Sequence, residues 1–483
     1  MSRPTSIVWL RRDLRLADNP ALHAASRRGV VIPVFIWAPD EEDVWAPGAA
    51  SQWWLHQSLL HLDRDLQARG TRLVLRRGAA ATVLGEVVRQ GDADLVVWNR
   101  CYEPALIARD AAVQTALAAD RVQVETFNAS LLYEPRTIRT QAGRPFQVFT
   151  PFWRTCLNAP KPAPPLPPPS ALRAPTRKPE TLRLGDLALQ PTVDWTAGLR
   201  AAWQPGERGA EAQLARFLDD ALARYPEARD RPDIAGSSRL SPHLHFGEIG
   251  PRQVWHAVET RAALDSTPGT YKAAEAYLRQ LGWREFAHHL LFHFPHTPDA
   301  PLRAEFAAFP WADDAEWLRA WQRGRTGYPI VDAGMRELWA TGWMHNRVRM
   351  IVASFLVKDL LLPWQAGARW FWDTLVDANL ANNTLGWQWT AGCGADAAPY
   401  FRIFNPVSQG EKFDPGGAYV RRWVPELHAL PAQWIHKPWD APPATLAAAA
   451  VELGRSYPMP IVDHGEARGH ALAALATIKR STR

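Results

Sequence analysis

Residues 326–350 read TGYPIVDAGMRELWATGWMHNRVRM, and residues 364–406 read WQAGARWFWDTLVDANLANNTLGWQWTAGCGADAAPYFRIFNP. Both segments combine long apolar runs with many Trp, Asn, Arg and Asp residues. Polar side chains set into an apolar helical frame need partners, or each costs roughly 1–3 kcal/mol. A large aromatic ligand with many polar groups would supply such partners, so we expect this stretch to be core and binding site at once.

Length and composition indicate a globular protein of two domains. The chain has 483 residues, of which 47% are hydrophobic and 22% are charged. It is therefore too long for one ordinary core and too apolar for a disordered chain. The 24 tryptophans are the outlier. They are either bulky core residues or part of stacking surfaces and an electron path, and only their positions can decide between these.

The net charge indicates which binding partners the protein suits, and the cysteine content indicates the cellular compartment. A net charge of +6 and a pI of about 9.3 suit a polyanionic partner, although net charge alone is weak evidence. Cys101, Cys156 and Cys393 lie far apart without metal-ligand spacing, so we expect neither a disulfide framework nor a metal. The chain shows no signal-peptide pattern and no run of about 18 apolar residues. We therefore expect a soluble, cytoplasmic monomer with no membrane contact and no obligate protein partner.

Residues 5–130 alternate between short apolar segments and helical patterns. SIVWL, VVIPVFIW, TRLVLRR, DLVVW and VQVETF read as buried strands, with helices expected over 52–68, 82–90 and 107–119. This alternation predicts a Rossmann-like α/β domain with a parallel sheet over residues 1–132. It carries no G-x-G-x-x-G motif, so a dinucleotide is not expected there in the usual way.

The remainder predicts a linker followed by an all-α domain. Residues 133–205 are the expected linker; PKPAPPLPPPSALRAPT at 159–175 is its stiff, proline-rich part, and residues 176–205 are expected to stay loop-like. Residues 206–483 read as helical. The expected helices are 211–225, 250–263, 270–294, 313–323, 329–341, 344–361, 365–377 and 464–479.

Several motifs carry a resemblance to a known family. Besides the segments quoted first, these are WLRRDLRLADNPAL from residue 9, FIWAPDEED from residue 35 and ASQWWLHQSLLHLDRDL from residue 50. Over nearly its whole length the chain resembles the photolyase/cryptochrome family of flavoproteins, and the latter two segments look closest to plant cryptochromes and class III bacterial photolyases. The resemblance implies a carboxy-terminal helical domain that binds FAD.

The family places a second, light-harvesting chromophore in the α/β domain when one is present. Methenyltetrahydrofolate or another pigment would be that antenna. The acidic run Asp40–Asp43 is either part of a folate site or a solvated loop. CYEPALIARD has Leu106 where class I photolyases usually carry an acid, so the sequence leaves the presence and the identity of the antenna undecided.

The resemblance assigns the FAD contacts to two groups of residues. The first group surrounds SSRLS, which taken alone favours an ordinary helix N-cap and which the resemblance assigns to the FAD pyrophosphate. It consists of Tyr225, Ser237, Ser238, Arg239, Leu240, Ser241, Tyr277 and Arg284. The second group consists of Trp343, Asn346, Arg349, Asp377, Asn379 and Asn383. Arg349 would pair with Asp377 beside the flavin, unless the two form a purely structural ion pair. Asn383 matches the residue that faces flavin N5, where asparagine favours fully reduced flavin.

Three tryptophans fall on the positions of the family's electron path. They are Trp387, Trp364 and Trp311. Stepwise electron transfer needs oxidisable aromatic rings spaced from the flavin to the surface. The alternative is that all three simply pack the helical domain.

The resemblance also implies a site for UV-damaged DNA. Trp283 and Trp389 match the two aromatic residues that flank a flipped-out pyrimidine dimer, since flat rings accept unstacked bases. Asn346 and Met350 match residues that contact its bases. The expected phosphate contacts are Arg229, Arg347 and Arg402.

Gln280 departs from the family pattern. Cyclobutane-dimer photolyases usually have glutamate here, three residues before Trp283. The glutamine amide can donate and accept hydrogen bonds but cannot transfer a proton. (6-4) photolyases also use glutamine but carry a catalytic histidine in the helix where this chain has MHNR. The sequence therefore favours a cyclobutane pyrimidine dimer photolyase, with a blue-light photoreceptor or a (6-4) photolyase as alternatives.

Overall fold

The computed structural model describes residues 4–265, 267–397 and 401–481. These residues form two compact units. The first unit comprises Met1–Ala223, Ser238–Pro295 and Val376–Leu380. The second unit comprises Arg224–Ser237, His296–Leu375 and Ala381–Arg483. The domain boundaries expected from the sequence stay a prediction.

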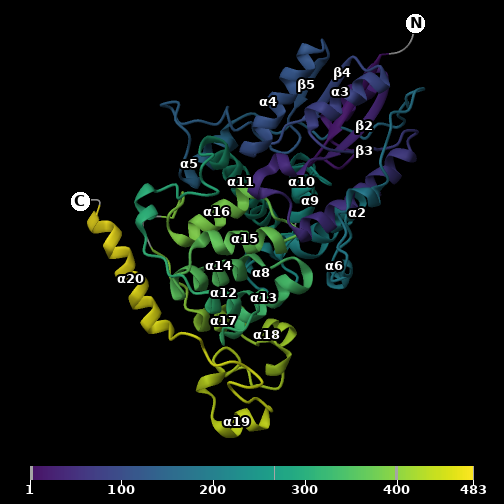
Figure 1. Ribbon diagram of the computed structural model, residues 1–483. Coiled ribbons are helices and arrows are strands. Elements are labelled where there is room, and N and C mark those ends of the chain that lie inside the picture. Colours follow the sequence, from purple (N-terminus) through teal and green to yellow (C-terminus); the bar gives the residue numbers. More distant parts are fainter. Residues whose placement is uncertain (1–3, 266, 398–400, 482–483) are drawn as a thin grey trace. The chain divides into compact units, whose positions relative to one another are not determined.

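The first unit contains a five-stranded parallel sheet in the order β3-β2-β1-β4-β5 (Figure 1). The strands are β1 (Thr5–Leu10), β2 (Val30–Trp37), β3 (Val74–Arg77), β4 (Leu95–Asn99) and β5 (Gln123–Phe127). Each overlaps one of the five apolar segments, so the expected parallel α/β fold is confirmed. In the central register Ile7 of β1 is paired with Ile32 on one side and Val96 on the other.

The sheet core explains why β1, β2 and β4 read as continuous apolar runs. Parallel strands covered on both faces bury every side chain, so they lack the alternation of a half-exposed strand. Trp9 of β1 and Trp98 of β4 are both buried, and their rings meet edge to face with centroids 5.5 Å apart.

The other regular elements of both units are helices, joined by turns and loops. In the first unit they are α1 (Pro20–Arg28), α2 (Ala49–Gln67), α3 (Ala80–Gly91), α4 (Pro104–Ala119), α5 (Phe149–Asn158), α6 (Ala197–Ala202), α7 (Glu207–Arg216), α9 (Ser241–His245), α10 (Pro251–Leu264) and α11 (Thr270–His293). In the second unit they are α8 (Tyr225–Ala228), α12 (Ala315–Gln322), α13 (Pro329–Thr341), α14 (Asn346–Ser354), α15 (Trp364–Thr374), α16 (Leu380–Ala391, whose first residue belongs to the first unit), α17 (Pro406–Phe413), α18 (Ala418–Trp423), α19 (Pro443–Ala448) and α20 (His464–Ser481). Within the described ranges, no helix is long and apolar enough to cross a bilayer.

Local structure departs from the sequence predictions at several places: α5 lies in the expected linker, and α17, α18 and α19 form where no helix is expected. The sequence predicts loop over residues 176–205, but Ala197–Ala202 form α6, because good helix formers surround the buried Leu199. The sequence predicts no helix over residues 380–391, where α16 forms. LANNTLGWQWTA contains weak helix formers without a clear period, so this helix depends on packing of buried residues such as Ala381 and Trp387.

A buried carboxylate in the first turn of α13 binds the segment that precedes this helix in the second unit. Asp332 is fully buried and accepts four hydrogen bonds. Thr326 donates two of them, from its N–H and its hydroxyl, each at 2.7 Å. The N–H of Gly327 donates at 3.1 Å and the hydroxyl of Tyr457 at 2.7 Å. The TGYPIVDAG segment is therefore tied to the chain near residue 457.

We predict that Asp332→Asn lowers the free energy of unfolding by roughly 2–4 kcal/mol, because one carboxylate oxygen becomes an amide N–H₂ that faces existing donors. Urea unfolding followed by circular dichroism measures the change. Asp313→Asn is the matched control, since Asp313 is exposed, and its effect should stay within about 0.5 kcal/mol. Equal stability of the two variants would contradict the role assigned to Asp332.

Candidate flavin and DNA-lesion sites

Ser238–Ser241 of the SSRLS motif form a tight turn in the first unit, in which the N–H of Leu240 lies 3.4 Å from Oγ of Ser238. Arg239 has a φ of +51°, and Leu240 follows with φ −84° and ψ −2°, just before α9 begins at Ser241. A left-handed residue next to a right-handed one directs successive backbone N–H groups to one side, which makes a nest for anions. The N-cap of α9 is Leu240, whose side chain accepts no hydrogen bond, so ordinary capping does not explain the motif.

Four of the predicted residues follow one another at helical spacing on α11. They are Tyr277, Gln280, Trp283 and Arg284. Tyr277 is buried against Phe217, with ring centroids 4.4 Å apart. Arg284 donates from Nη1 to the carbonyl of Ser130 at 2.6 Å. Gln280 and Trp283 are partly exposed, which leaves them accessible to a ligand.

The Trp283 ring is held from one side by a residue that the sequence analysis missed. Phe149, the first residue of α5, stacks on Trp283 with centroids 3.8 Å apart and planes 6° from parallel. The guanidinium of Arg279 lies 4.9 Å from the Phe149 centroid. A ring fixed in this way is pre-organised for a further stacking partner. The aromatic run in VFTPFW was the available signal, but it lies in the segment predicted to be linker.

Asn379 lies next to a buried neutral histidine in the first unit. Nδ1 of His288 bonds to the carbonyl of Arg284 at 2.9 Å, so Nε2 faces Nδ2 of Asn379 at 3.5 Å. Burial and the nearby charge of Arg284 lower the pKa of His288 to about 4, so the ring is uncharged at neutral pH. Asp377 is buried two residues earlier.

In the second unit, α14 carries the predicted residues of the MHNR segment. Nδ2 of Asn346 lies 3.9 Å from the sulfur of Met350, one helical turn away. Nε of Arg349 donates to the carbonyl of Met344 at 2.8 Å, and its guanidinium lies 5.9 Å from the Trp343 centroid. The expected pair of Arg349 with Asp377 would join the two units and stays a prediction, and so do the flavin contacts of Tyr225 and Ser237.

The orientation of the Asn383 amide is set by α15. Nδ2 of Asn383 donates to the carbonyl of Ala368 at 3.1 Å. With the N–H₂ end committed to that carbonyl, the Oδ1 end is the acceptor that remains. This suits the expected role of accepting a hydrogen bond from a ligand N–H.

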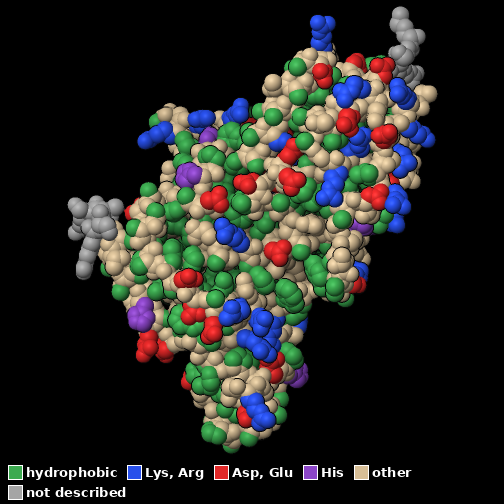
Figure 2. Space-filling view, viewed as in Figure 1, with side chains coloured by type: hydrophobic (Ala, Val, Ile, Leu, Met, Phe, Trp, Pro, Cys, Tyr) green, Lys and Arg blue, Asp and Glu red, His purple; other side chains and the backbone are tan. Residues whose placement is uncertain are grey.

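Basic residues of the second unit rest on aromatic rings. The guanidinium of Arg229 lies 5.7 Å from the Tyr225 centroid and that of Arg402 lies 4.7 Å from the Trp389 centroid. Figure 2 shows Lys and Arg side chains gathered over α17 and α18, the helices that carry Lys412, Arg421 and Arg422. A basic face of this kind suits a polyanion.

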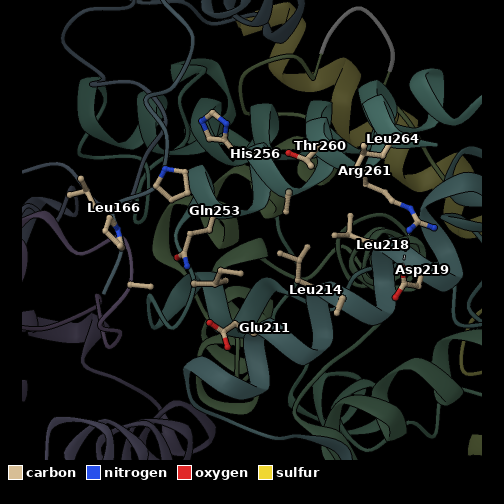
Figure 3. A pocket seen from close by; sticks show the side chains of 16 residues that line it. Leu166, Glu211, Leu214, Leu218, Asp219, Gln253, His256, Thr260, Arg261 and Leu264 are labelled. Carbon is tan, nitrogen blue, oxygen red and sulfur yellow. Dashed lines mark ion pairs between the residues drawn. The ribbon is translucent and has the colours of Figure 1, made fainter. Parts of the chain in front are cut away.

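The first unit also has an open groove of about 750 Å³, which is lined by other residues than those predicted to bind flavin or DNA (Figure 3). Leu214, Leu218 and Leu264 line its apolar floor, and Arg261 pairs with Asp219 at 3.2 Å along its rim. The groove contains none of the predicted flavin or DNA residues. We therefore do not assign it to the flavin.

Comparison with known proteins identifies the family. Residues 6–170 match the DNA photolyase model, and residues 277–477 match the FAD binding domain of DNA photolyase. The chain is 49% identical over 478 residues to a deoxyribodipyrimidine photo-lyase of Agrobacterium fabrum, covering 99% of this chain and 98% of the relative. The chain belongs to the photolyase/cryptochrome family.

Two further members of the family show where the chain stands within it. It is 44% identical over 486 residues to cryptochrome-1 of Arabidopsis thaliana, covering 98% of this chain and 70% of the relative. The crystal structure of a class III photolyase from Agrobacterium tumefaciens matches with a TM-score of 0.95 and 48% identity, covering 99% of this chain and 98% of that one. The expected likeness to class III photolyases and plant cryptochromes is confirmed, as is a carboxy-terminal FAD-binding domain.

The three predicted electron-path tryptophans of this photolyase-family chain all lie in the second unit. Trp387 and Trp364 are buried, whereas Trp311 is partly exposed, which is the order expected for a path that ends at the surface. Trp387 packs edge to face against Phe371 at 5.0 Å and Trp321 at 6.2 Å. Core packing and electron transfer are therefore compatible roles for Trp387.

We predict that Trp364→Phe slows photoreduction of bound FAD by an external reductant by about tenfold or more, because phenylalanine is much harder to oxidise; tenfold corresponds to a barrier higher by about 1.4 kcal/mol. Flavin absorbance under blue light gives the rate. Trp434→Phe, in a turn outside the path, is the control and should reduce at the wild-type rate. Wild-type kinetics in Trp364→Phe would remove this residue from the path.

Proposed function

We propose that this protein is a deoxyribodipyrimidine photo-lyase that uses light to repair cyclobutane pyrimidine dimers in DNA. The observation that carries the proposal is 49% identity across the whole chain with the Agrobacterium fabrum relative of that name. Four local features support it, namely the anion nest at SSRLS, the acceptor end of Asn383, the stacked Trp283 and the basic face.

The residues present fit FAD as the cofactor. The nest at Arg239 and Leu240, together with the hydroxyls of Ser238 and Ser241, would hold the diphosphate. Oδ1 of Asn383 would accept from a flavin N–H and so favour reduced flavin. When bound, reduced FAD supplies the light-driven electron donor for repair. A second antenna chromophore stays a prediction.

The lesion would be recognised by rings that are already held in place. Trp283 rests on Phe149, and Trp389 lies beneath the guanidinium of Arg402. Each ring can stack on an unstacked base, a contact worth about 1–3 kcal/mol. Asn346 and Met350 would contact the base edges. We further propose that the protein acts as a cytoplasmic monomer.

A blue-light photoreceptor is the second candidate. The 44% identity to cryptochrome-1 of Arabidopsis thaliana favours it, together with glutamine at position 280 in place of the usual acid. The Trp283 stack favours repair instead, because a receptor needs no aromatic platform for a flipped base.

A repair assay separates the two candidates. Purified protein is mixed with an oligonucleotide containing one thymine dimer and exposed to blue or near-UV light, and the restored thymines are measured by chromatography. We expect repair in the light and none in the dark. A flavin-bearing protein that leaves this dimer intact would refute the photo-lyase proposal; a (6-4) photoproduct substrate run in parallel should stay unrepaired.

We predict that Gln280→Glu keeps or raises the quantum yield of dimer repair, by up to a few fold, because a carboxylic acid can donate the same hydrogen bond and can also share a proton. Yield per absorbed photon is measured on the dimer oligonucleotide. Gln433→Glu, the same substitution at an exposed position of the second unit, is the control and should leave the yield within about twofold. Loss of repair in Gln280→Glu would show that the amide itself is required.

A further inference from the structure

One of the arginines expected to bind a DNA phosphate, Arg347, forms an ion pair with a carboxylate of the protein. In the second unit, Nη2 of Arg347 lies 3.0 Å from Oδ1 of Asp230. Nε of Arg229 lies 3.9 Å from the same oxygen. One carboxylate therefore faces two guanidinium groups that are expected to meet DNA phosphates.

The position of Arg347 does not depend on Asp230 alone. Its guanidinium carbon lies 4.3 Å from the centroid of Phe413, the last residue of α17. Its backbone N–H donates to Nδ1 of His345, the N-cap of α14, at 3.2 Å. The Arg347 side chain would therefore keep its place if Asp230 lost its charge.

Arg347 also has unused capacity to donate hydrogen bonds. Its Nε is buried and has no partner among the residues that the structure describes. A guanidinium presents its donors in a fork that matches a phosphate. The pair with Asp230 is partly exposed, with 18% of the Arg347 side chain and 32% of the Asp230 side chain accessible, so it is weak enough to exchange.

His345 adds no positive charge next to Arg347. Burial lowers the pKa of His345 to about 4, so the ring is neutral when DNA would bind. The charged groups near Arg347 include Asp230 and Arg229, and the ammonium of Lys412 lies 5.1 Å from the Phe413 ring centroid.

We propose that Asp230 is an affinity-setting residue that competes with a DNA phosphate for Arg347, so that binding to the DNA backbone requires this carboxylate to give up its partner. The inference rests on the proposed function, because it assumes DNA as the ligand. Since phosphate contacts carry no base information, the competition weakens binding to damaged and undamaged DNA alike. Its effect is to limit the time the protein spends on undamaged DNA.

The test is Asp230→Asn, which removes the charge and keeps the shape. We expect about 3- to 10-fold tighter binding to an undamaged duplex at low salt, because one negative charge near a phosphate is lost. The slope of log K against log salt should steepen by up to about 1, the value for one additional phosphate contact. In steady-state repair, KM for the dimer oligonucleotide should fall by a similar factor while kcat stays unchanged.

Two companion variants make the outcome decisive. Asp230→Ala should tighten binding like Asp230→Asn; weaker binding in Asp230→Ala would show that Asp230 only positions Arg347 and would overturn the proposal. In an Arg347→Gln background, Asp230→Asn should lose most of its effect. An undiminished effect there would mean that Asp230 acts through another group, which also overturns the proposal.

Glu452→Gln is the matched control for net charge. Glu452 pairs with Arg455 at 3.2 Å on an exposed part of the second unit, so the substitution changes the charge equally. It should shift DNA affinity by less than about twofold. If the wild-type protein repairs dimers but Asp230→Asn and Glu452→Gln bind DNA with the same affinity, this inference alone is overturned. If the wild-type protein repairs no dimers, the proposed function is overturned.

Discussion

The close approach of α15 to α16 fixes the chemistry-bearing side chains of the second unit. A Cβ atom on Gly367 would lie 2.1 Å from Cη2 of Trp387, so glycine is required for the two helices to meet. The next residue, Ala368, accepts the hydrogen bond from Asn383. Asn383 and Trp387 are one turn apart on α16, so two adjacent positions of α15 set both the expected flavin acceptor and the expected first electron donor.

A second theme is support for partly exposed rings and cations. Phe149 backs Trp283, Arg402 covers Trp389, and Phe413 carries Arg347. Each contact limits the rotamers of a side chain that would meet DNA, so less conformational entropy remains to be lost on binding. Phe149 and Phe413 are distant in sequence from the residues that they hold, so these two supports are a product of the fold.

The sequence predicted the sheet well and the helical supports poorly. Continuous apolar runs such as VVIPVFIW have few interpretations other than a buried parallel strand, and β2 lies in that run. By contrast, α16 forms where LANNTLGWQWTA shows no helical period, because packing outweighs propensity. Residue roles came from matching family motifs. Pairings such as Phe149 with Trp283, or Asp230 with Arg347, depend on long-range contacts that no local pattern reveals.

The flavin content of the purified full-length chain tests the central claim most directly. The protein is incubated with excess FAD, freed of unbound flavin and denatured, and the released chromophore is identified by chromatography and measured by absorbance. We expect FAD at close to one molecule per chain. Protein that releases no FAD after this treatment would contradict the assignment of the SSRLS nest and Asn383 to flavin binding, and with it the proposed light-driven repair.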